Sequence, residues 1–249
     1  MDDNIFDKLK DLTGNLPDKL NILEEQIDIN VQMEYFEYSK KIKKEDTIEL
    51  KDIPNLSNTK LDINDKKRII VQLSNIDDPK AFNRIKTFLK KAPKELKDWT
   101  ILALQESRML LESSLLDENQ IYISTGLGGK NNKLRYFIVL IGNNLNEFED
   151  FQKKIILSEF ELALKNSNGE LEKIIFNKTF ATFTALIPFD ISLPKLFKST
   201  ITECNQYGNF LKQNFIVTNV KVLSTKEIKE FIKKNELPNN NTKFNDYEE

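Results

Sequence analysis

A glycine-rich stretch, Gly126-Leu127-Gly128-Gly129-Lys130, holds three of the seven glycines of the chain and ends in a lysine. Exposed backbone N–H groups in such a loop, together with Lys130, Lys133 and Arg135, could bind an anion, a nucleotide or a peptide backbone. The phosphate-binding motif G-x-x-x-x-G-K-[ST] fits only in part, because Ser124 stands at its first glycine and Asn131 at its last position. The alternative, which the sequence favours, is a flexible hairpin turn that uses the positive φ available to glycine.

Basic residues recur along the stretch 79–97. They are Lys80, Arg84, Lys86, Lys90, Lys91, Lys94 and Lys97. Such a run is usually the solvated face of a helix. The alternative is a contact surface for RNA or for the acidic N-terminal part of the chain. The net charge of −2 gives no global field of the kind that marks a nucleic-acid binder, and we expect no sequence readout of DNA.

The chain has no histidine and one cysteine, Cys204. The lack of histidine excludes Ser-His-Asp and Cys-His catalysis and histidine metal ligands, and with one cysteine a structural zinc site is ruled out as well. Any catalysis would need carboxylates, lysine, tyrosine or a bound hard cation. No catalytic motif is recognisable, so we expect a protein that is not an enzyme and that has no metal and no cofactor.

Two polar residues stand in apolar surroundings. Glu106 falls on the apolar arc of a predicted helix, centred on Trp99, so its carboxylate must find a donor or stay protonated. Asn219 lies inside an apolar predicted strand and could hydrogen-bond a loop. We predict structural roles for both residues.

Helices are expected over residues 61–117. Apolar residues recur at helical spacing in three segments, separated by short loops near residues 75–78 and 92–93. Asp78 and Pro79 are the N-cap and first-turn residues of the second segment. The third, about 93–116, is apolar on two arcs, so we predict a buried spine between the small helices and the rest of the chain. Short loops between antiparallel helices suggest a HEAT-like unit.

Strands alternate with helices over residues 118–237. The predicted strands are 120–125, 134–141, 171–176, 180–187 and 214–223, and the helices are 145–165, 194–206 and 224–237. From residue 134 the order β-α-β-β-α-β matches the split-βαβ, or ferredoxin-like, topology. The strand 120–125 is expected as an extra hairpin partner of 134–141, although the last strand should take the same edge. A sandwich like that of roadblock-type or secretion-chaperone-type modules is the alternative.

The two ends of the chain are the least patterned parts. Residues 1–60 carry 14 acidic and 9 basic residues, a net charge of −5, and we predict a partly ordered acidic arm. Residues 238–249 are rich in asparagine and are predicted to be disordered. The first residues do not resemble a signal peptide and no apolar run is long enough to cross a bilayer, so we expect a cytoplasmic protein.

The sequence therefore predicts an α+β protein with a helical unit packed on a mainly antiparallel sheet domain. The favoured function is protein binding, as an adaptor, chaperone or assembly factor. The alternatives are an RNA- or ribosome-associated factor that uses residues 79–97 and 126–135, and an anion or nucleotide sensor at Gly126–Lys130.

Overall fold

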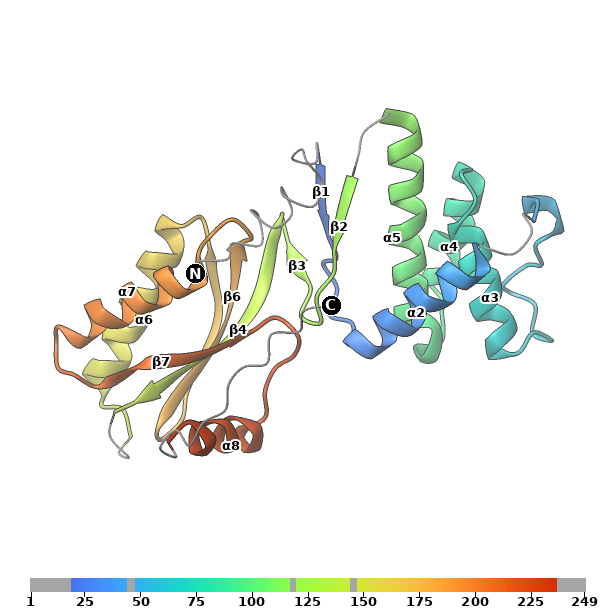
Figure 1. Ribbon diagram of the computed structural model, residues 1–249. Coiled ribbons are helices and arrows are strands. Elements are labelled where there is room, and N and C mark those ends of the chain that lie inside the picture. Colours follow the sequence, from blue (N-terminus) through green and yellow to red (C-terminus); the bar gives the residue numbers. More distant parts are fainter. Residues whose placement is uncertain (1–18, 44–47, 117–119, 144–146, 237–249) are drawn as a thin grey trace, which may run out of the picture.

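The computed structural model describes residues 19–43, 48–116, 120–143 and 147–236. These residues form seven α-helices, one short 3-10 helix and two sheets, which places the chain in the α+β class. Figure 1 shows a group of helices and a sheet half on opposite sides of a small two-stranded ladder. The predicted tail at 238–249 and the first 18 residues of the predicted arm lie outside the described residues.

The helical half consists of α2, α3, α4 and α5. Their bounds are Ile29–Ile42, Ile63–Ser74, Pro79–Leu89 and Lys94–Leu116, and the 3-10 helix spans Leu50–Asp52 between the first two. As the sequence predicts, Asp78 caps α4 by accepting from the Lys80 backbone N–H, with Pro79 in the first turn. Helix α5 packs against α2, α3 and α4.

Much of the predicted N-terminal arm belongs to this helical half. Leu23, Ile27, Tyr35, Ile53 and Leu56 are buried in the same apolar core as the residues of α3, α4 and α5. The described residues between 19 and 60 are thus ordered and packed into the helical core. The net negative charge of residues 1–60 suggested a solvated segment, although apolar residues recur along α2 and the loop that follows it.

The larger sheet has the order β7-β4-β6-β5, with every neighbour antiparallel. The bounds are Lys133–Gly142 for β4, Glu170–Phe176 for β5, Phe180–Pro188 for β6 and Leu211–Thr218 for β7. The helices of this half are α6 (Asp150–Asn166), α7 (Leu193–Asn205) and α8 (Thr225–Glu236). Figure 1 shows α6 and α7 on one face and α8 at the other side of the sheet.

Both faces of the central strand β4 are buried, as its uninterrupted apolar run predicts. Ile138 and Leu140 face the core that includes Phe160 of α6 and Phe197 of α7. Their neighbours Phe137 and Val139 belong to a second, smaller core with Ile228 of α8. Successive side chains of a strand point to opposite faces, so one strand can supply both cores.

The predicted hairpin between 120–125 and 134–141 is wrong. The strand exists, as β2 (Gln120–Ile123), but it pairs in parallel with β1 (Lys19–Ile22) in a separate ladder. The free edge of β4 is shared by β7 and by the two-residue strand β3, Gly129–Lys130. The sequence predicted both residues 120–125 and the last strand at this one edge of β4. The edge has room for only one long strand, and β7 occupies it.

Candidate functional site

The glycine stretch is a buried joint between the two halves. A Cβ atom added to Gly126 would lie 1.7 Å from the Val220 carbonyl oxygen, and one on Gly128 would lie 2.4 Å from the carbonyl oxygen of Glu24. Gly128 also has a φ of +67°, in the left-handed region that favours glycine. The glycines therefore let three backbone segments approach one another closely.

The backbone of this joint is hydrogen-bonded within the protein. The N–H groups of Leu127, Gly128 and Gly129 donate to the carbonyls of Asn219, Thr125 and Glu24. An anion would need those same donors. This geometry favours the structural interpretation of the stretch over the anion-binding one. Asn219 lies just after β7 and contributes through its backbone carbonyl, which accepts from Leu127 at 3.0 Å.

Near the joint, Arg135 is hydrogen-bonded within the protein, whereas Lys130 is exposed to solvent. Arg135 makes two hydrogen bonds to the Glu172 carboxylate, at 2.7 and 2.8 Å, and donates to the Leu127 carbonyl at 2.9 Å. The hydrogen bond with Glu172 raises the pKa of Arg135 despite burial. Lys130 is exposed and Lys133 is half-buried. The turn between β3 and β4 is Asn131-Asn132, both with positive φ.

In the basic stretch on α4, the arginine is likewise hydrogen-bonded within the protein and the lysines are exposed. The Arg84 guanidinium donates to the carbonyls of Leu50, Ile53 and Pro54, so it holds the loop before α3 in place. Lys80, Lys86 and Lys90 are exposed to solvent. The structure therefore does not bring these side chains together with Lys130, Lys133 and Arg135 into one described site.

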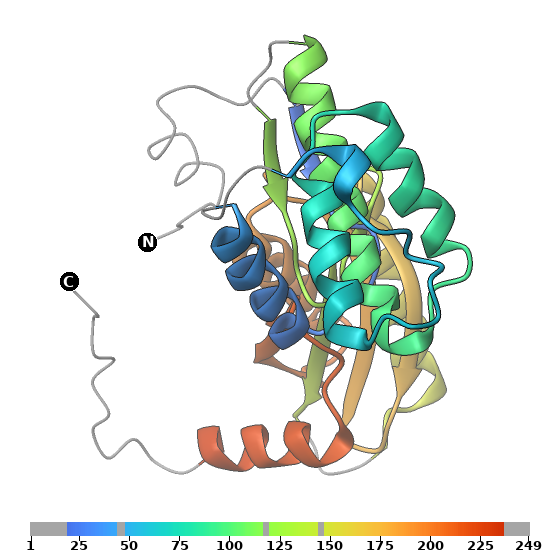
Figure 2. The same ribbon diagram turned by 90° about the vertical axis from the view of Figure 1, so that its right-hand side faces the viewer.

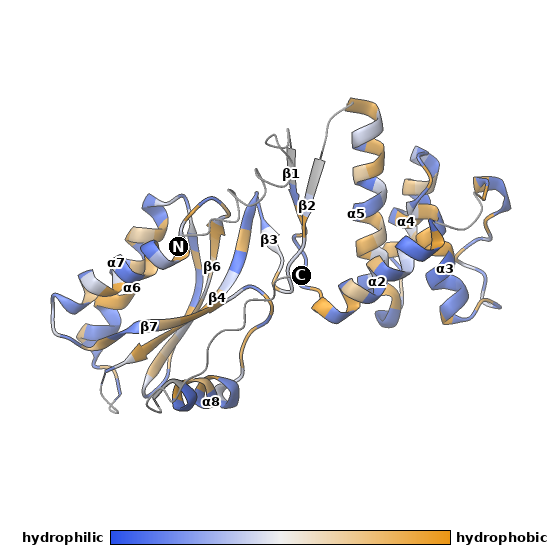
Figure 3. Ribbon diagram, in the orientation of Figure 1, coloured by the Kyte–Doolittle hydropathy of each residue, from blue (hydrophilic) through white to orange (hydrophobic). Residues whose placement is uncertain are grey.

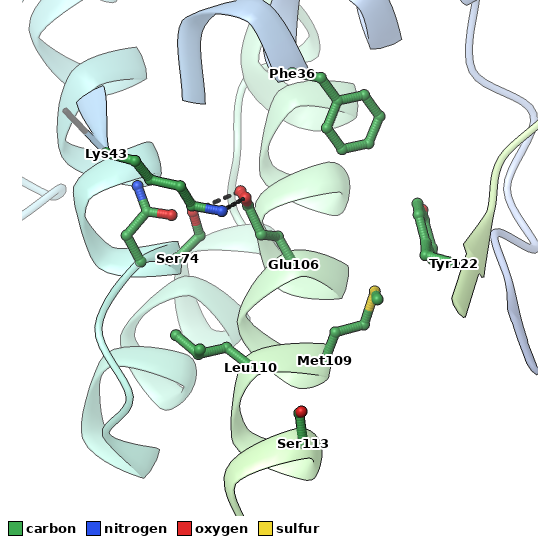
Figure 4. A pocket seen from close by; sticks show the side chains of 9 residues that line it. Phe36, Lys43, Ser74, Glu106, Met109, Leu110, Ser113 and Tyr122 are labelled. Carbon is green, nitrogen blue, oxygen red and sulfur yellow. Dashed lines mark hydrogen bonds and ion pairs between the residues drawn. The ribbon is translucent and has the colours of Figure 1, made fainter. Parts of the chain in front are cut away.

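A pocket of about 620 Å³ lies between α2, α3, α5 and β2. Its polar lining residues are Lys43, Ser74, Asn75, Glu106 and Ser113, and its apolar lining residues are Phe36, Met109, Leu110 and Tyr122. Figure 4 shows the Lys43 amine directed at the Glu106 carboxylate on one side, with Tyr122 on the opposite side beyond Met109. The volume is within the range of small-ligand pockets, roughly 300–1,000 Å³. This pocket is the candidate functional site.

Glu106 is the centre of the polar side of the pocket. Its carboxylate accepts from Tyr35 at 2.5 Å, from Ser39 at 2.9 Å and from Ser74 at 3.1 Å. Lys43 adds an ion pair at 2.6 Å. Glu106 therefore has the donors that its place on an apolar helix face required.

The hydrogen bonds also set the charge of Glu106. Burial raises the pKa of its carboxyl, but the hydrogen bonds from Lys43 and Tyr35 and the charge of Lys43 outweigh this, so its pKa lies below the ordinary value of 4.5. The pKa of Tyr35 is raised well above 10.0, by burial first and then by the Glu106 carboxylate. At neutral pH Glu106 is therefore an ionised carboxylate, and the Tyr35 hydroxyl beside it is a neutral phenol.

Three buried polar atoms of the pocket lining have no hydrogen-bond partner within the described part of the protein. They are Nδ2 and Oδ1 of Asn75 and the hydroxyl oxygen of Tyr122. A buried donor or acceptor without a partner costs about 1–3 kcal/mol. These atoms have less than 1 Å² of accessible surface, so they are unpaired groups packed behind the pocket wall and are not open to a ligand in the pocket.

Sequence reasoning identified only Glu106 of this site. Tyr35, Ser39 and Lys43 are spaced four apart, so they lie on one face of α2 and converge on Glu106. That spacing was a usable signal, but it lies in the stretch predicted to be an arm. The position of Tyr122 depends on the β1–β2 pairing, which no local pattern indicates.

Comparisons with known proteins add little to this geometry. No protein-family model matches the chain, and no curated protein matches it in sequence. Among solved structures, one described as a REP-associated tyrosine transposase bound to a REP hairpin is similar over 41% of this chain and 63% of its own, with 8% identity and a TM-score of 0.32. So low a TM-score supports no conclusion about fold or function.

None of the described helices combines the length and the apolar character that a membrane span needs. Nor do the described residues contain a group of three or more Cys, Asp or Glu side chains that could hold a metal ion.

Proposed function

We propose that this chain is a non-catalytic cytoplasmic protein-binding module, an adaptor, chaperone or assembly factor, and that the C-terminal half of α5 contacts the partner. The observation that carries the proposal is the change of burial along α5. Leu96, Leu102 and Leu104 are buried, whereas Leu115 and Leu116 are 77% and 52% exposed. Figures 1 and 2 show this end of α5 extending beyond α3 and α4.

The exposed end of α5 remains apolar. Leu111 and Leu115 are four residues apart and so lie on one helix face, next to the half-buried Met109 and Leu110 at the edge of the pocket. Figure 3 shows hydrophobic colouring continuing to the C-terminal end of the helix. Exposed leucines at the end of a projecting helix are typical of a surface that packs against another protein.

The scaffold agrees with this proposal. The strand order β7-β4-β6-β5, with α6 and α7 on one face, supports a ferredoxin-like half. The short connections between α3, α4 and α5 support a HEAT-like unit. Both are scaffolds that serve many functions, so they are compatible with binding but do not specify a partner.

The RNA-binding alternative has less support. Arg84 and Arg135, the two arginines of the predicted basic surfaces, donate to protein carbonyls and to Glu172. The lysines of the stretch 79–97 remain exposed; they are Lys80, Lys86, Lys90, Lys91, Lys94 and Lys97. RNA binding through them would show a steep dependence on salt.

Affinity purification under native salt, with and without nuclease, tests the proposal. The full chain should retain a stoichiometric protein partner that the double substitution Leu115→Glu/Leu116→Glu releases. The control is Leu162→Glu on α6, because Leu162 is 53% exposed and distant in sequence. Loss of the partner on nuclease treatment, or equal loss with the control, would contradict binding through α5.

A further inference from the structure

A second pocket, of about 460 Å³, lies between α4 and the loop before α3. Figure 1 shows α4 and this loop on the side of α5 that faces away from the larger sheet. From its lining we infer that this pocket binds a small polyol that carries two phosphate groups. None of the described lining residues belongs to α5, so the inference does not depend on the proposed protein contact of that helix.

Positive charge in this pocket is not compensated by a carboxylate of the lining. Its charged residues are Lys80, Arg84 and Lys91, and no aspartate or glutamate among the described residues lines it. Both lysines are exposed, so a ligand can reach their amines. Lys91 donates to the Ser57 hydroxyl at 2.7 Å, a neutral partner that leaves its charge in place. Lysine and arginine side chains together commonly bind phosphate groups.

Arg84 is the fixed cation of the pocket. It is half-buried, and its guanidinium donates to three main-chain carbonyls, those of Leu50, Ile53 and Pro54. Carbonyls carry no formal charge, so they hold the side chain in place without neutralising it. A guanidinium has five N–H donors, so donors remain for a phosphate oxygen.

The spacing of the cations favours two phosphate groups. Lys80 and Arg84 are one turn apart on α4, and Lys91 follows the end of the helix, roughly 10 Å further along the axis at about 1.5 Å per residue. A ligand with two phosphates can pair with cations at both ends of the pocket. A single phosphate pairs with one end and leaves the other solvated.

The polyol body follows from the side chains between the cations. Asn83 and Thr87 are four residues apart on α4, line the pocket and are exposed, so their amide and hydroxyl groups are open to sugar hydroxyls. The apolar lining residues, Leu56 and Phe88, are only 5% and 6% exposed. The described lining therefore has no open aromatic ring on which a base of single-stranded RNA could stack, and this favours a small ligand over RNA.

Calorimetric titration of the intact chain at matched ionic strength tests the inference with fructose 1,6-bisphosphate, fructose 6-phosphate, tripolyphosphate and an oligouridylate. We expect the bisphosphate to bind, and the monophosphate to bind about tenfold more weakly because it loses charge-assisted hydrogen bonds. Tripolyphosphate, which lacks the hydroxyls, and the oligouridylate should also bind more weakly than the bisphosphate. Absence of bisphosphate binding, or equal binding of tripolyphosphate or of the RNA, would overturn the inference.

Two pairs of lysine substitutions give a matched control. Lys80→Gln/Lys91→Gln removes two charges from the pocket lining, and Lys86→Gln/Lys90→Gln removes two exposed charges that do not line it. The first pair should weaken fructose 1,6-bisphosphate at least about tenfold, and the second much less, because solvent and salt screen charges outside the pocket. Equal losses would indicate a diffuse effect of charge and overturn the inference.

Lipid headgroups and free sugars can both supply a polyol with two phosphates. Flotation with phosphatidylcholine vesicles, with and without phosphatidylinositol 4,5-bisphosphate, separates the two sources. Binding to the phosphoinositide vesicles that Lys80→Gln/Lys91→Gln abolishes supports the inference with a headgroup as ligand, and no vesicle binding supports it with a free ligand. Vesicle binding that this variant retains, together with unchanged titration by fructose 1,6-bisphosphate, would contradict the assignment to this pocket.

Discussion

Glu106 shows how one carboxylate can be accommodated inside an apolar helix bundle. Three hydroxyl donors, from Tyr35, Ser39 and Ser74, and the Lys43 ammonium surround it. The Lys43 side chain is 53% exposed, so the ion pair adds little stability by itself, but loss of a hydrogen-bonded partner in the more buried part of the network is costly. The network therefore fixes the position of α2 against α5 more than it raises the overall stability.

Stability should depend on the charge of Glu106. The folded state has the lower pKa, so protonation favours the unfolded state, and the contribution is present above the ordinary value of 4.5 and lost as the pH falls through the folded value. We expect Glu106→Gln to cost about 1–3 kcal/mol at pH 7 and progressively less below pH 4.5. Urea unfolding of both proteins at several pH values measures this difference. A difference that stays constant from neutral to acidic pH would refute an ionised Glu106.

The glycine joint makes a second prediction at the residue scale. A Cβ at Gly126 would meet a backbone oxygen at 1.7 Å, whereas one at Gly169 would meet its nearest atom at 3.0 Å. We expect Gly126→Ala to destabilise the protein by about 1–3 kcal/mol or more, because the main chain must move, and Gly169→Ala to cost less. Chemical denaturation of the two variants compares them, and equal costs would argue against a close-packed joint.

At the scale of elements, α5 changes character halfway along its length. The periodicity of its sequence correctly predicts one long helix with two apolar arcs. It could not predict which part of each arc is covered, because that depends on where α3 and α4 end. Leu104 and Leu115 lie on the same face of the helix, because eleven residues make about three full turns, yet one is buried and the other is 77% exposed.

The two ends of α5 should therefore respond differently to the same substitution. Leu102→Ala, at a buried position, should cost about 2–5 kcal/mol because it removes packed methyl groups and leaves a cavity. Leu115→Ala should stay within about 0.5 kcal/mol of the unmodified chain. Thermal or urea unfolding gives both values. A large cost at Leu115 would mean that this end of the helix is packed within the chain.

The β1–β2 ladder is the other unusual element. Two parallel strands without further strands are marginally stable in water, and among the described residues only β1 pairs with β2. We expect the amides of residues 21–23 to exchange with solvent much faster than those of residues 138–140 in the central strand β4. Hydrogen exchange followed by NMR tests this, and similar protection of the two segments would contradict it.

At the scale of the whole molecule, the chain is organised around separate apolar cores. One core belongs to the helical half and runs from Leu23 to Leu104. The other two lie on the two faces of the larger sheet. Local patterns predicted most helices and strands, because each follows its own hydrophobic period. They did not predict the candidate site, because Phe36, Glu106 and Tyr122 come from three distant elements and meet only through tertiary packing.

The central proposal, that the exposed end of α5 contacts a protein partner, can be tested directly by site-specific photocrosslinking in cells. A photoreactive amino acid at Leu115 should give one dominant crosslinked protein that resists nuclease, while the same group at Leu162, which is also exposed and lies on α6, should not capture it. No crosslink at Leu115, or the same product at both positions, would contradict a specific protein-binding surface on α5.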